Sequence, residues 1–281
     1  MAKFTCNFIS YTFKRTVDIT VVVPTVTIPE SMGLTANTTV KADENGNFEI
    51  LGGGEKPRHT KDAKYPVLYL FHGMGNNHAQ WTGYTNVELF AEERNMAVVM
   101  ISAENKSYVN TDADKFFDFI EEELPDFVCG MFPISRRPED TYIAGLSMGG
   151  FGTLVHALSF PEKYRALGAF SAAIQLNPAS LSGGKDTGIN PDYDPETLAD
   201  RLIEAKKAFP AVYMACGQKD FLYETNKNFR DKLLAAGVDV TWDELPEYGH
   251  EWRFWNIEVE KFLDFIMPLR TDAFAGAKRQ I

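Results

Sequence analysis

The sequence has few cysteines, no concentrated positive charge and no long apolar run. Its three cysteines, Cys6, Cys129 and Cys216, are too few and too scattered for a disulfide framework or a zinc site, and the odd count fits a reducing compartment. The 281 residues carry 28 Lys and Arg against 39 Asp and Glu, a net charge of −11, and the densest basic spots are pairs such as Arg136 and Arg137. An acidic surface repels phosphate backbones, so we expect no nucleic-acid partner.

Signals for membrane crossing and for export are also missing from the pattern. No stretch approaches the roughly 18 consecutive apolar residues of a transmembrane helix. The first residues alternate polar and apolar side chains and lack the continuous apolar segment of a signal peptide. We therefore expect no membrane partner and a cytoplasmic protein; a leader removed from the chain is the alternative.

What is present is an ordinary globular composition, with 44% hydrophobic and 24% charged residues, which excludes a disordered or collagen-like chain. From about residue 65 onward, apolar runs alternate with amphipathic segments, which predicts an α/β fold with a mostly parallel sheet. The predicted strands of this part are 67–71, 97–101, 141–144, 167–170, 211–215 and 238–245. Residues 16–23 and 48–51 predict antiparallel strands at one edge of the same sheet.

Amphipathic helices are predicted between these strands, and Pro125 is expected to kink the second of them. They cover residues 87–94, 113–131, 148–159, 221–236 and 256–268. Residues 174–210 interrupt the rhythm with several prolines and glycines before a helix at 195–208, and such an insertion usually covers or shapes a site. We therefore predict a single domain, residues 1–281, with a cap insertion at 174–210; a solvated excursion without a role is the alternative.

The sharpest chemical signal is the sequence Gly-Leu-Ser-Met-Gly-Gly at residues 145–150, between a predicted strand and a predicted helix. This is the setting of a nucleophile elbow, in which a tight turn exposes a serine at the carboxyl edge of the sheet. The turn leaves no room for side chains at 145 and 149, so both are glycine. Ser147 is therefore the predicted nucleophile; an inert serine in a tight structural turn is the alternative.

A serine hydroxyl needs a base that takes its proton, and the sequence offers five histidines. In elbow enzymes of this type the chain order is serine, acid, histidine, so His59, His72 and His78 come too early. His156 falls in the middle of the predicted helix, which indicates a structural role. His250 follows the last predicted strand and precedes the last helix, and it is the predicted base.

The acid must lie between the serine and the histidine, in a loop after a strand. Asp220 fits because it follows the strand 211–215 closely, and its carboxylate would hold the His250 tautomer that faces Ser147. Four further acids compete for this role. They are Asp192, Asp194, Glu224 and Asp243, which lie in the insertion, in a helix or within a strand.

The remaining part is an oxyanion hole, made by the backbone N–H after the nucleophile and by an N–H of the loop after the strand 67–71. The first is that of Met148. The second loop reads His-Gly-Met-Gly at 72–75, and Met74 N–H is the predicted donor, with Gly75 as the alternative. His72 itself is expected to order this loop.

These motifs resemble the esterase D group of α/β-hydrolases, which includes tributyrin esterases, S-formylglutathione hydrolases, feruloyl and acetyl esterases, and mycolyltransferases. The spacings of 73 and 30 residues between Ser147, Asp220 and His250 are similar to those of the group. The motifs that carry the resemblance are residues 71–75, Trp81, 132–135 (Phe-Pro-Ile-Ser), 145–152, 217–220 and 249–252 (Gly-His-Glu-Trp). The insertion at 174–210 matches no subgroup.

The resemblance implies an α/β-hydrolase fold and hydrolysis of carboxylic esters through an acyl-enzyme, without a metal or an organic cofactor. Its implied partner is a small ester substrate with a short acyl or aryl-acyl group, acylated oligosaccharides included; a homo-oligomer is left open. S-formylglutathione hydrolysis and acyl transfer are alternatives, although S-formylglutathione hydrolases usually have Ser-Gly-Leu-Thr where this chain has His-Gly-Met-Gly. A non-catalytic binding protein on the same scaffold is a third class.

Two tryptophans are candidates for the substrate pocket. Trp81 comes soon after the oxyanion loop and Trp252 directly after the predicted base, so both are predicted to line an acyl or aryl site. Core packing is the alternative for each of them.

Overall fold

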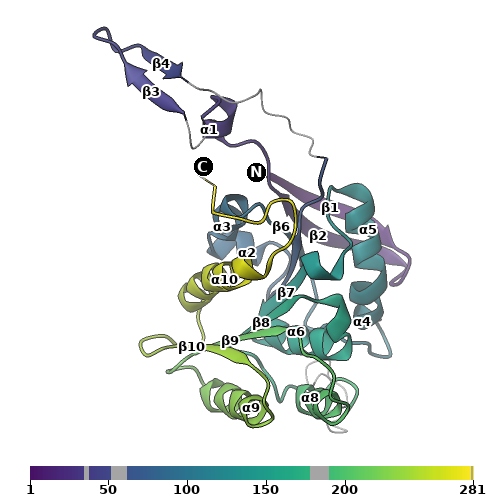
Figure 1. Ribbon diagram of the computed structural model, residues 1–281. Coiled ribbons are helices and arrows are strands. Elements are labelled where there is room, and N and C mark those ends of the chain that lie inside the picture. Colours follow the sequence, from purple (N-terminus) through teal and green to yellow (C-terminus); the bar gives the residue numbers. More distant parts are fainter. Residues whose placement is uncertain (35–37, 52–61, 178–189, 280) are drawn as a thin grey trace.

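A mixed sheet of eight strands forms the centre of the protein (Figure 1). The computed structural model describes residues 1–34, 38–51, 62–177, 190–279 and 281. The strand order is β1-β2-β6-β5-β7-β8-β9-β10, in which β1–β2 and β2–β6 are antiparallel and all further neighbours are parallel. The strands are β1 (Ala2–Ser10), β2 (Arg15–Val23), β5 (Val67–Phe71), β6 (Ala97–Ile101), β7 (Thr141–Leu146), β8 (Ala166–Phe170), β9 (Ala211–Gly217) and β10 (Val240–Leu245). The predicted fold class, with antiparallel strands at the N-terminal side, is confirmed.

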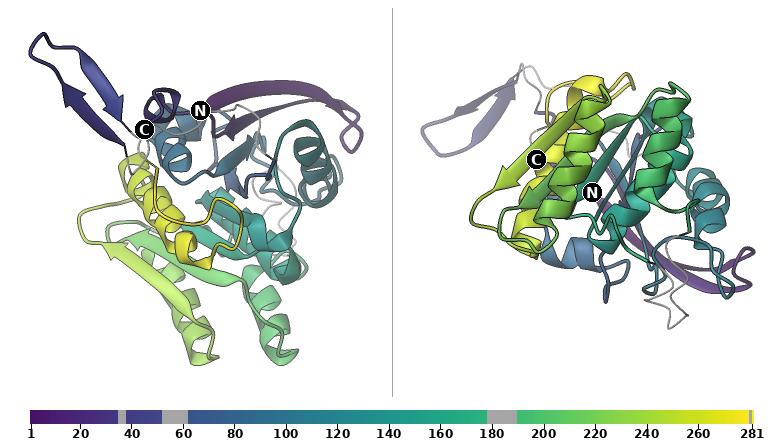
Figure 2. Two further views of the ribbon diagram at one scale, coloured as in Figure 1. Left: turned by 45° about the horizontal axis from the view of Figure 1, so that its top comes forward. Right: turned by 90° about the horizontal axis from the view of Figure 1, so that it is seen from below.

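Helices cover both faces of the sheet (Figure 2), which explains why the central strands are continuous apolar runs. One face is covered by α2 (Gln80–Tyr84), α3 (Val87–Glu93) and α10 (Trp252–Ile266), and the other by α4 (Phe116–Asp118), α5 (Leu124–Met131), α6 (Met148–Ser159), α8 (Pro195–Glu204) and α9 (Tyr223–Ala235). Each layer buries its own apolar cluster against the sheet. Of the helices that the structure describes, none has both the length and the apolar character to cross a bilayer.

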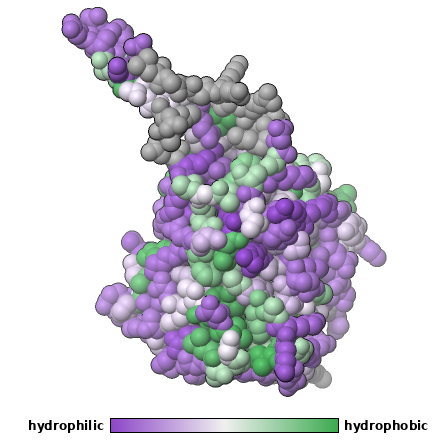
Figure 3. Space-filling view, in the orientation of Figure 1, coloured by the Kyte–Doolittle hydropathy of each residue, from purple (hydrophilic) through white to green (hydrophobic). Residues whose placement is uncertain are grey.

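The N-terminal pairing differs from the prediction. β2 pairs with β1, whereas residues 48–51 form β4 (Phe48–Leu51), which pairs only with β3 (Thr39–Ala42). These two strands form a separate hairpin that projects from the body (Figure 1), and its tip is hydrophilic (Figure 3). The Asn45–Gly46 turn joins the two segments nearest to it in the sequence, so it brings β3 and β4 together without tying either to the sheet.

The predicted helix at 113–131 is interrupted. It consists of α4, a π-helical turn (Phe119–Glu123) and α5, in which Pro125 occupies the first turn. Proline lacks an N–H and clashes with the carbonyl four residues earlier, so a widened turn before it accommodates the ring. The predicted disturbance at Pro125 is therefore real, and it takes the form of a π-helical turn.

The predicted cap at 174–210 lies partly outside the described residues, because 178–189 are not among them. Its helix, α8, is shorter than the predicted 195–208, and it is capped by Asp194, whose carboxylate accepts the Thr197 N–H at 3.1 Å. Leu198 and Leu202 are buried in the apolar cluster under α6. The described part of the segment thus belongs to one helical layer, and the cap role stays a prediction.

Glu258 is a buried carboxyl on the inner side of α10, and it gives a prediction about stability. It accepts a hydrogen bond from Tyr213 Oη at 2.8 Å, and burial together with the charge of Asp243 raises its pKa from 4.5 to about 7. An acid whose folded pKa is raised costs stability as the pH rises from its unfolded pKa to its folded one. We expect Glu258→Gln to raise the free energy of unfolding at pH 8 by up to about 3 kcal/mol, with no gain at pH 4.

Urea unfolding of both proteins at pH 4 and pH 8 checks this expectation. Glutamine keeps an acceptor for the Tyr213 hydroxyl, so the comparison isolates the charge. A stability difference between the two proteins that is the same at both pH values would contradict the assignment.

Candidate active site

The predicted site residues lie at one edge of the sheet because they follow parallel strands. The carboxyl ends of parallel strands meet at the same edge, where α/β proteins bind their ligands. Ser147 follows β7, Asp220 follows β9, His250 follows β10, and the oxyanion loop at 72–75 follows β5. Strand register therefore brings together residues that are far apart in the sequence.

Ser147 stands in a sharp turn between β7 and α6. Its φ of 54° and ψ of −117° are a strained combination for a residue with a side chain. Its N–H donates to the Phe170 carbonyl and its carbonyl accepts from Ala173 N–H, each at 3.0 Å, so neighbouring strand ends hold the strained backbone. The hydroxyl makes no hydrogen bond with any described residue.

The glycines on both sides of Ser147 are sterically required. A Cβ on Gly145 would lie 2.4 Å from the Gly149 carbonyl oxygen, and a Cβ on Gly149 would lie 2.5 Å from the Phe71 carbonyl oxygen. Real Cβ atoms do not approach backbone so closely, so any larger residue would force the strand and helix apart. The geometry thus has the form expected of a nucleophile elbow.

His250 and Asp220 are paired. The His250 Nδ1 atom lies 2.9 Å from Asp220 Oδ2, and the carboxylate is fully buried while the imidazole is partly exposed. Asp220 Oδ1 accepts a second hydrogen bond, from Leu222 N–H at 2.9 Å. Because an ionised carboxylate only accepts, His250 Nδ1 carries the proton and Nε2 is the free ring nitrogen.

Burial by itself would raise the pKa of Asp220, but hydrogen bonds from His250, Leu222 N–H and the Ser171 hydroxyl outweigh it and lower the pKa. An acid with a lowered folded pKa loses its stabilising contribution only as the pH falls through that pKa. Asp220 is therefore ionised near neutral pH, as the pairing with His250 requires.

Two further contacts fix the loops that carry this pair. A Cβ on Gly217 would lie 2.3 Å from the Tyr248 carbonyl oxygen, and Lys219 N–H donates to that same oxygen at 2.9 Å. The loop after β9 thus packs directly on the loop after β10. This contact sets the distance between Asp220 and His250 before any substrate is present.

Ser147 and His250 are linked through Trp255 and Ser171. The Trp255 ring meets the His250 ring edge to face, with centroids 4.9 Å apart, and its Nε1–H donates to Ser171 Oγ at 3.2 Å. Ser171 directly follows Phe170, whose carbonyl holds the Ser147 N–H. This short series of contacts puts the imidazole and the nucleophile turn on the same side of the sheet edge. Sequence reasoning missed Ser171, although this residue also follows a parallel strand.

The loop after β5 turns sharply beside Ser147. A Cβ on Gly73 would lie 3.4 Å from the Ser147 Cβ, so the two backbones are in contact. Gly75 N–H donates to Asn105 Oδ1 at 2.7 Å, whereas Met74 N–H has no acceptor among the described residues. Met148 is the first residue of α6, where a helix leaves N–H groups without an intrahelical acceptor.

His72 is buried beneath this loop. Its Nδ1 lies 2.7 Å from the Gly73 carbonyl oxygen and its Nε2 lies 2.9 Å from Ala103 N. A backbone N–H can donate only to an unprotonated ring nitrogen, so His72 is neutral with its proton on Nδ1. Burial lowers its pKa to about 4, which keeps it neutral. These contacts agree with a role in ordering the loop.

The remaining histidines have other surroundings, and His59 lies outside the described residues. His156 is buried within α6, with Nδ1 2.7 Å from Glu121 Oε1 and Nε2 2.9 Å from the Tyr108 carbonyl oxygen. His78 Nδ1 lies 2.7 Å from Thr20 Oγ1. Neither ring faces Ser147 in these contacts, and both have packing roles.

The two tryptophans differ in position. Trp81 is only 1% exposed, and its Nε1–H donates to the Phe71 carbonyl at 3.0 Å, so it packs in the core instead of lining a pocket as predicted. It was misplaced because nearness in sequence to the oxyanion loop does not tell which side of the backbone a side chain takes. Trp252 is half-buried and stands edge to face against Trp81 and Trp255.

Phe221 is a residue that sequence reasoning missed. Its side chain is 78% exposed, and its ring centroid lies 4.7 Å from that of His250. Met74 of the oxyanion loop is also 58% exposed. Large apolar side chains exposed beside polar reactive groups are typical of a binding surface. The position of Phe221, directly after the predicted acid, was the available signal.

Other places that sites usually occupy do not compete with this edge. A cavity of about 580 Å³ opens at the opposite edge, where β9 and β10 begin, and none of the predicted site residues lines it. Within the part of the chain that the structure describes, no three His, Cys, Asp or Glu side chains are grouped to hold a metal ion. Ser147, Asp220, His250 and residues 72–75 lie instead at the other edge, on the loops after β7, β9, β10 and β5.

Comparisons with known proteins show the family of the chain. The model of the Esterase family matches residues 55–261. An acetyl esterase of Caldicellulosiruptor saccharolyticus is 31% identical over 210 residues, which are 68% of this chain and 79% of that protein.

Solved structures with the same fold cover nearly the whole chain. FphF, a fluorophosphonate-binding serine hydrolase of Staphylococcus aureus, and the S-formylglutathione hydrolase FrmB of the same organism each superpose with a TM-score of 0.74 at 26% identity, covering 94% of this chain and 98% of theirs. A ferulic acid esterase superposes with a TM-score of 0.75 at 22% identity, covering 96% and 98%. At 22% identity, the similarity to the ferulic acid esterase shows a shared fold alone.

Proposed function

This chain belongs to the Esterase family and is a carboxylic ester hydrolase with the α/β-hydrolase fold, and from this premise we propose that it is a serine esterase in which Ser147, His250 and Asp220 form the catalytic triad. The observation that carries the proposal is the pairing of His250 Nδ1 with the buried, ionised Asp220 at the edge where the strained Ser147 turn stands. A free Nε2 and an unbonded serine hydroxyl are the two groups that the first chemical step needs.

In the first half-reaction, Ser147 Oγ attacks the ester carbonyl carbon while His250 Nε2 takes the hydroxyl proton. Asp220 stabilises the imidazolium that forms. The carbonyl oxygen becomes negative in the tetrahedral intermediate and accepts hydrogen bonds from the N–H groups of Met74 and Met148. The Met148 N–H also lies at a helix N-terminus, where the helix dipole favours negative charge. His250 then returns the proton to the alcohol oxygen, the C–O bond breaks, and an acyl-enzyme remains.

In the second half-reaction, a water molecule takes the place of the alcohol. His250 removes one of its protons as the water oxygen attacks the acyl carbon, and the same two N–H groups meet the oxyanion. Collapse of the intermediate breaks the bond to Ser147 Oγ, which regains a proton from His250. The products are the acid and the free enzyme, and every proton taken by the imidazole is returned.

The substrate class that we propose is a short-chain acyl or aryl-acyl ester, such as an acetyl, butyryl or feruloyl ester, with acylated oligosaccharides as a natural source. The exposed side chains of Phe221 and Met74 and the half-buried Trp252 offer apolar and aromatic groups around the loops of the proposed site. The acetyl esterase relative favours the short acyl group. Thioester hydrolysis is a second candidate because an S-formylglutathione hydrolase is 26% identical over nearly the whole chain.

A panel of substrates tests the proposal: acetyl, butyryl, octanoyl and feruloyl esters, with S-formylglutathione included. We expect the acetyl and butyryl esters to be turned over fastest, and the feruloyl ester to depend on the ring of Phe221. An aromatic pair is worth about 0.5–1.5 kcal/mol, so Phe221→Ala should raise KM for the feruloyl ester by about threefold to tenfold and leave that for the acetyl ester nearly unchanged.

Phe48→Ala is the matched control, since Phe48 is 73% exposed on the projecting hairpin. Phe48→Ala should leave KM unchanged for both the feruloyl and the acetyl ester. A far higher kcat/KM for S-formylglutathione than for any oxygen ester would assign the enzyme to the second candidate. No turnover of any member would reject the proposed substrate class.

A further inference from the structure

The segment after β6 contains the highest concentration of left-handed backbone in the described chain. Outside glycine, nine described residues have a positive φ, and four of them are Glu104 (49°), Asn105 (58°), Ser107 (56°) and Tyr108 (63°). Residues with a side chain rarely adopt this backbone conformation because it costs free energy. It persists where surrounding contacts impose it, often at functional sites. The segment therefore calls for an explanation in terms of what it contacts.

Three hydrogen bonds join this segment, residues 103–108, to the oxyanion loop at 72–75. Ala103 N–H donates to His72 Nε2 at 2.9 Å, Tyr108 Oη donates to the His72 carbonyl at 2.8 Å, and Asn105 Oδ1 accepts from Gly75 N–H at 2.7 Å. The first two hold the start of the loop. The third reaches its tip.

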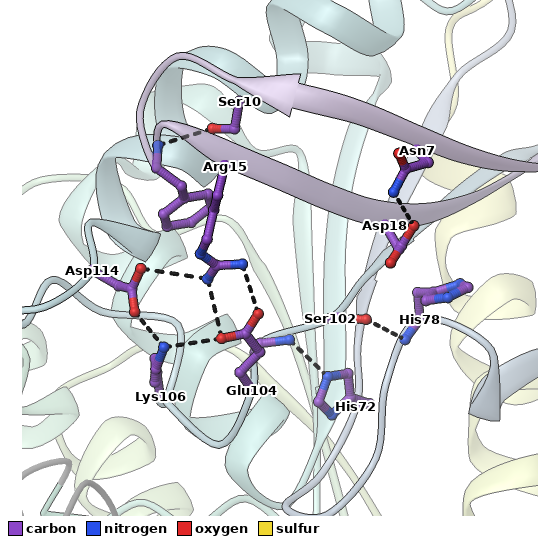
Figure 4. A network of polar contacts seen from close by, with 12 residues as sticks. Asn7, Ser10, Arg15, Asp18, His72, His78, Ser102, Glu104, Lys106 and Asp114 are labelled. Carbon is purple, nitrogen blue, oxygen red and sulfur yellow. Dashed lines mark hydrogen bonds and ion pairs between the residues drawn. The ribbon is translucent and has the colours of Figure 1, made fainter.

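A network of charged groups holds the segment from its outer side (Figure 4). Glu104 lies between Arg15 and Lys106, with Oε1 2.8 Å from Arg15 Nη1 and Oε2 2.9 Å from Lys106 Nζ, and Asp114 joins the same two cations. The His72 ring lies to the right of Glu104 in this view. The side chains of Arg15 and Glu104 are partly exposed, and ion pairs open to solvent are individually weak, so the specific restraint on the loop comes from the inner side.

At the tip of the loop, residues 73–76 form a turn. Asn76 N–H donates to the Gly73 carbonyl at 3.3 Å, and Gly75 has a φ of 79°, the value of the third residue of a type II turn. A type II turn changes to type I when its central peptide unit rotates by about half a turn. In this loop the central unit consists of the Met74 carbonyl and the Gly75 N–H.

Both ends of that peptide unit are held by asparagine side chains. The Met74 carbonyl accepts from Asn76 Nδ2 at 3.1 Å, and the Gly75 N–H donates to Asn105 Oδ1. The preceding unit is held as well, because the Gly73 carbonyl accepts from His72 Nδ1. In a trans peptide the N–H points away from the carbonyl, so the Met74 N–H points away from His72 and stays without an acceptor.

We propose that Asn105 is a positioning residue of the oxyanion hole: it anchors the Gly75 N–H at the tip of the turn while His72 holds the Gly73–Met74 peptide unit, and the two anchors together keep the Met74 N–H in place for the developing oxyanion. The inference rests on the proposed function. Asparagine suits the place because it tolerates a left-handed backbone and supplies an acceptor at the end of a short side chain. Asn105 is 30 residues from its partner in the sequence, so no local pattern joins the two.

The test is Asn105→Gly, which removes the acceptor and also relieves the left-handed strain, so the fold is not weakened at this residue. Loss of a whole oxyanion donor costs about 10²–10³ in rate, and loss of its positioning should lower kcat for p-nitrophenyl acetate by about tenfold to a hundredfold, with KM within about threefold of the wild-type value. The melting temperature should be unchanged or higher.

Glu104→Gly is the matched control, since Glu104 is the neighbouring residue with the same sign of φ and its side chain turns away from the loop. It should keep kcat within about twofold of the wild-type value. If relief of left-handed strain by itself lowers kcat, both variants should show the loss. If loss of the Asn105 side-chain oxygen lowers kcat, only Asn105→Gly should show it.

A trifluoromethyl ketone supplies a readout that a merely structural role would not move. The ketone carbon bonds to the serine Oγ, the hydroxyl proton passes to His250, and the carbonyl oxygen becomes an oxyanion in the same hole. We expect its affinity for Asn105→Gly to fall in proportion to kcat, while that of the product acetate stays the same. If wild-type enzyme binds the ketone and the variant binds it equally well, the role of Asn105 is rejected; if wild-type enzyme neither binds it nor cleaves esters, the proposed function fails first.

Discussion

Replacement of Ser147 by alanine is expected to lower kcat for p-nitrophenyl acetate by about 10⁴–10⁶ and to leave KM nearly unchanged. Alanine removes the only atom of the residue that bonds to the acyl carbon. A residual rate should remain, because the Met74 and Met148 N–H groups can still stabilise an oxyanion. The variant should fold normally, because the Ser147 hydroxyl makes no hydrogen bond with a described residue and its backbone contacts do not involve the side chain.

Two measurements check this prediction: the steady-state rate, and the site of labelling by a fluorophosphonate probe, located by mass spectrometry. The probe should label Ser147 in the wild-type protein and nothing in Ser147→Ala. Ser159→Ala, at the other end of α6, is the matched control and should be labelled and active like the wild type. Labelling of another residue, or wild-type turnover by Ser147→Ala, would show that the nucleophile lies elsewhere.

The second large effect is expected for Asp220→Asn, with a loss in kcat of up to about 10⁴. The reason lies in two of the hydrogen bonds that the carboxylate accepts, those from Leu222 N–H and from His250. Leu222 N–H needs an acceptor, so the asparagine oxygen takes that side and the amide NH₂ faces His250 Nδ1. Nδ1 then accepts, the proton moves to Nε2, and the imidazole has no lone pair for the Ser147 hydroxyl.

Circular dichroism and thermal unfolding should show that Asp220→Asn is folded. The expected loss should appear in kcat for the acetyl ester. Asp192→Asn serves as the control, since Asp192 is exposed and pairs with Arg201. If Asp192→Asn is the variant that loses activity, the acid has been misassigned. Two further acids between the serine and the histidine have structural partners: Asp194 caps α8 and Asp243 pairs with Lys261.

The predictions that hold best are those in which a local pattern has a single physical solution. The helix 148–159 has the predicted bounds, and the glycines at 145 and 149 are packed so closely that no other residue fits. The strand 97–101 also has the predicted bounds, because a short run of buried apolar residues between polar turns is readable from hydrophobicity alone.

The predictions that failed depended on which distant segments pair. β1 was not recognised as the partner of β2, and residues 48–51 were assigned to the sheet although they form a separate hairpin. Trp81 was assigned to the pocket and is a core residue. In each case the local sequence is compatible with both outcomes, and the free energy that decides between them comes from packing against residues that are remote along the chain.

The sequence by itself determined the turn that carries Ser147, the order of the proposed nucleophile, acid and base, and the alternation of strand and helix that sends their loops to one edge. Those features follow from backbone sterics and hydrophobic period, which act over a few residues. Only the tertiary structure decided that Asn105 holds Gly75, that Trp255 and Ser171 support the His250–Asp220 pair, and that Phe221 is exposed beside the imidazole. These contacts join residues on different strand ends, and their geometry is set by sheet register and loop packing, for which no local pattern carries the information.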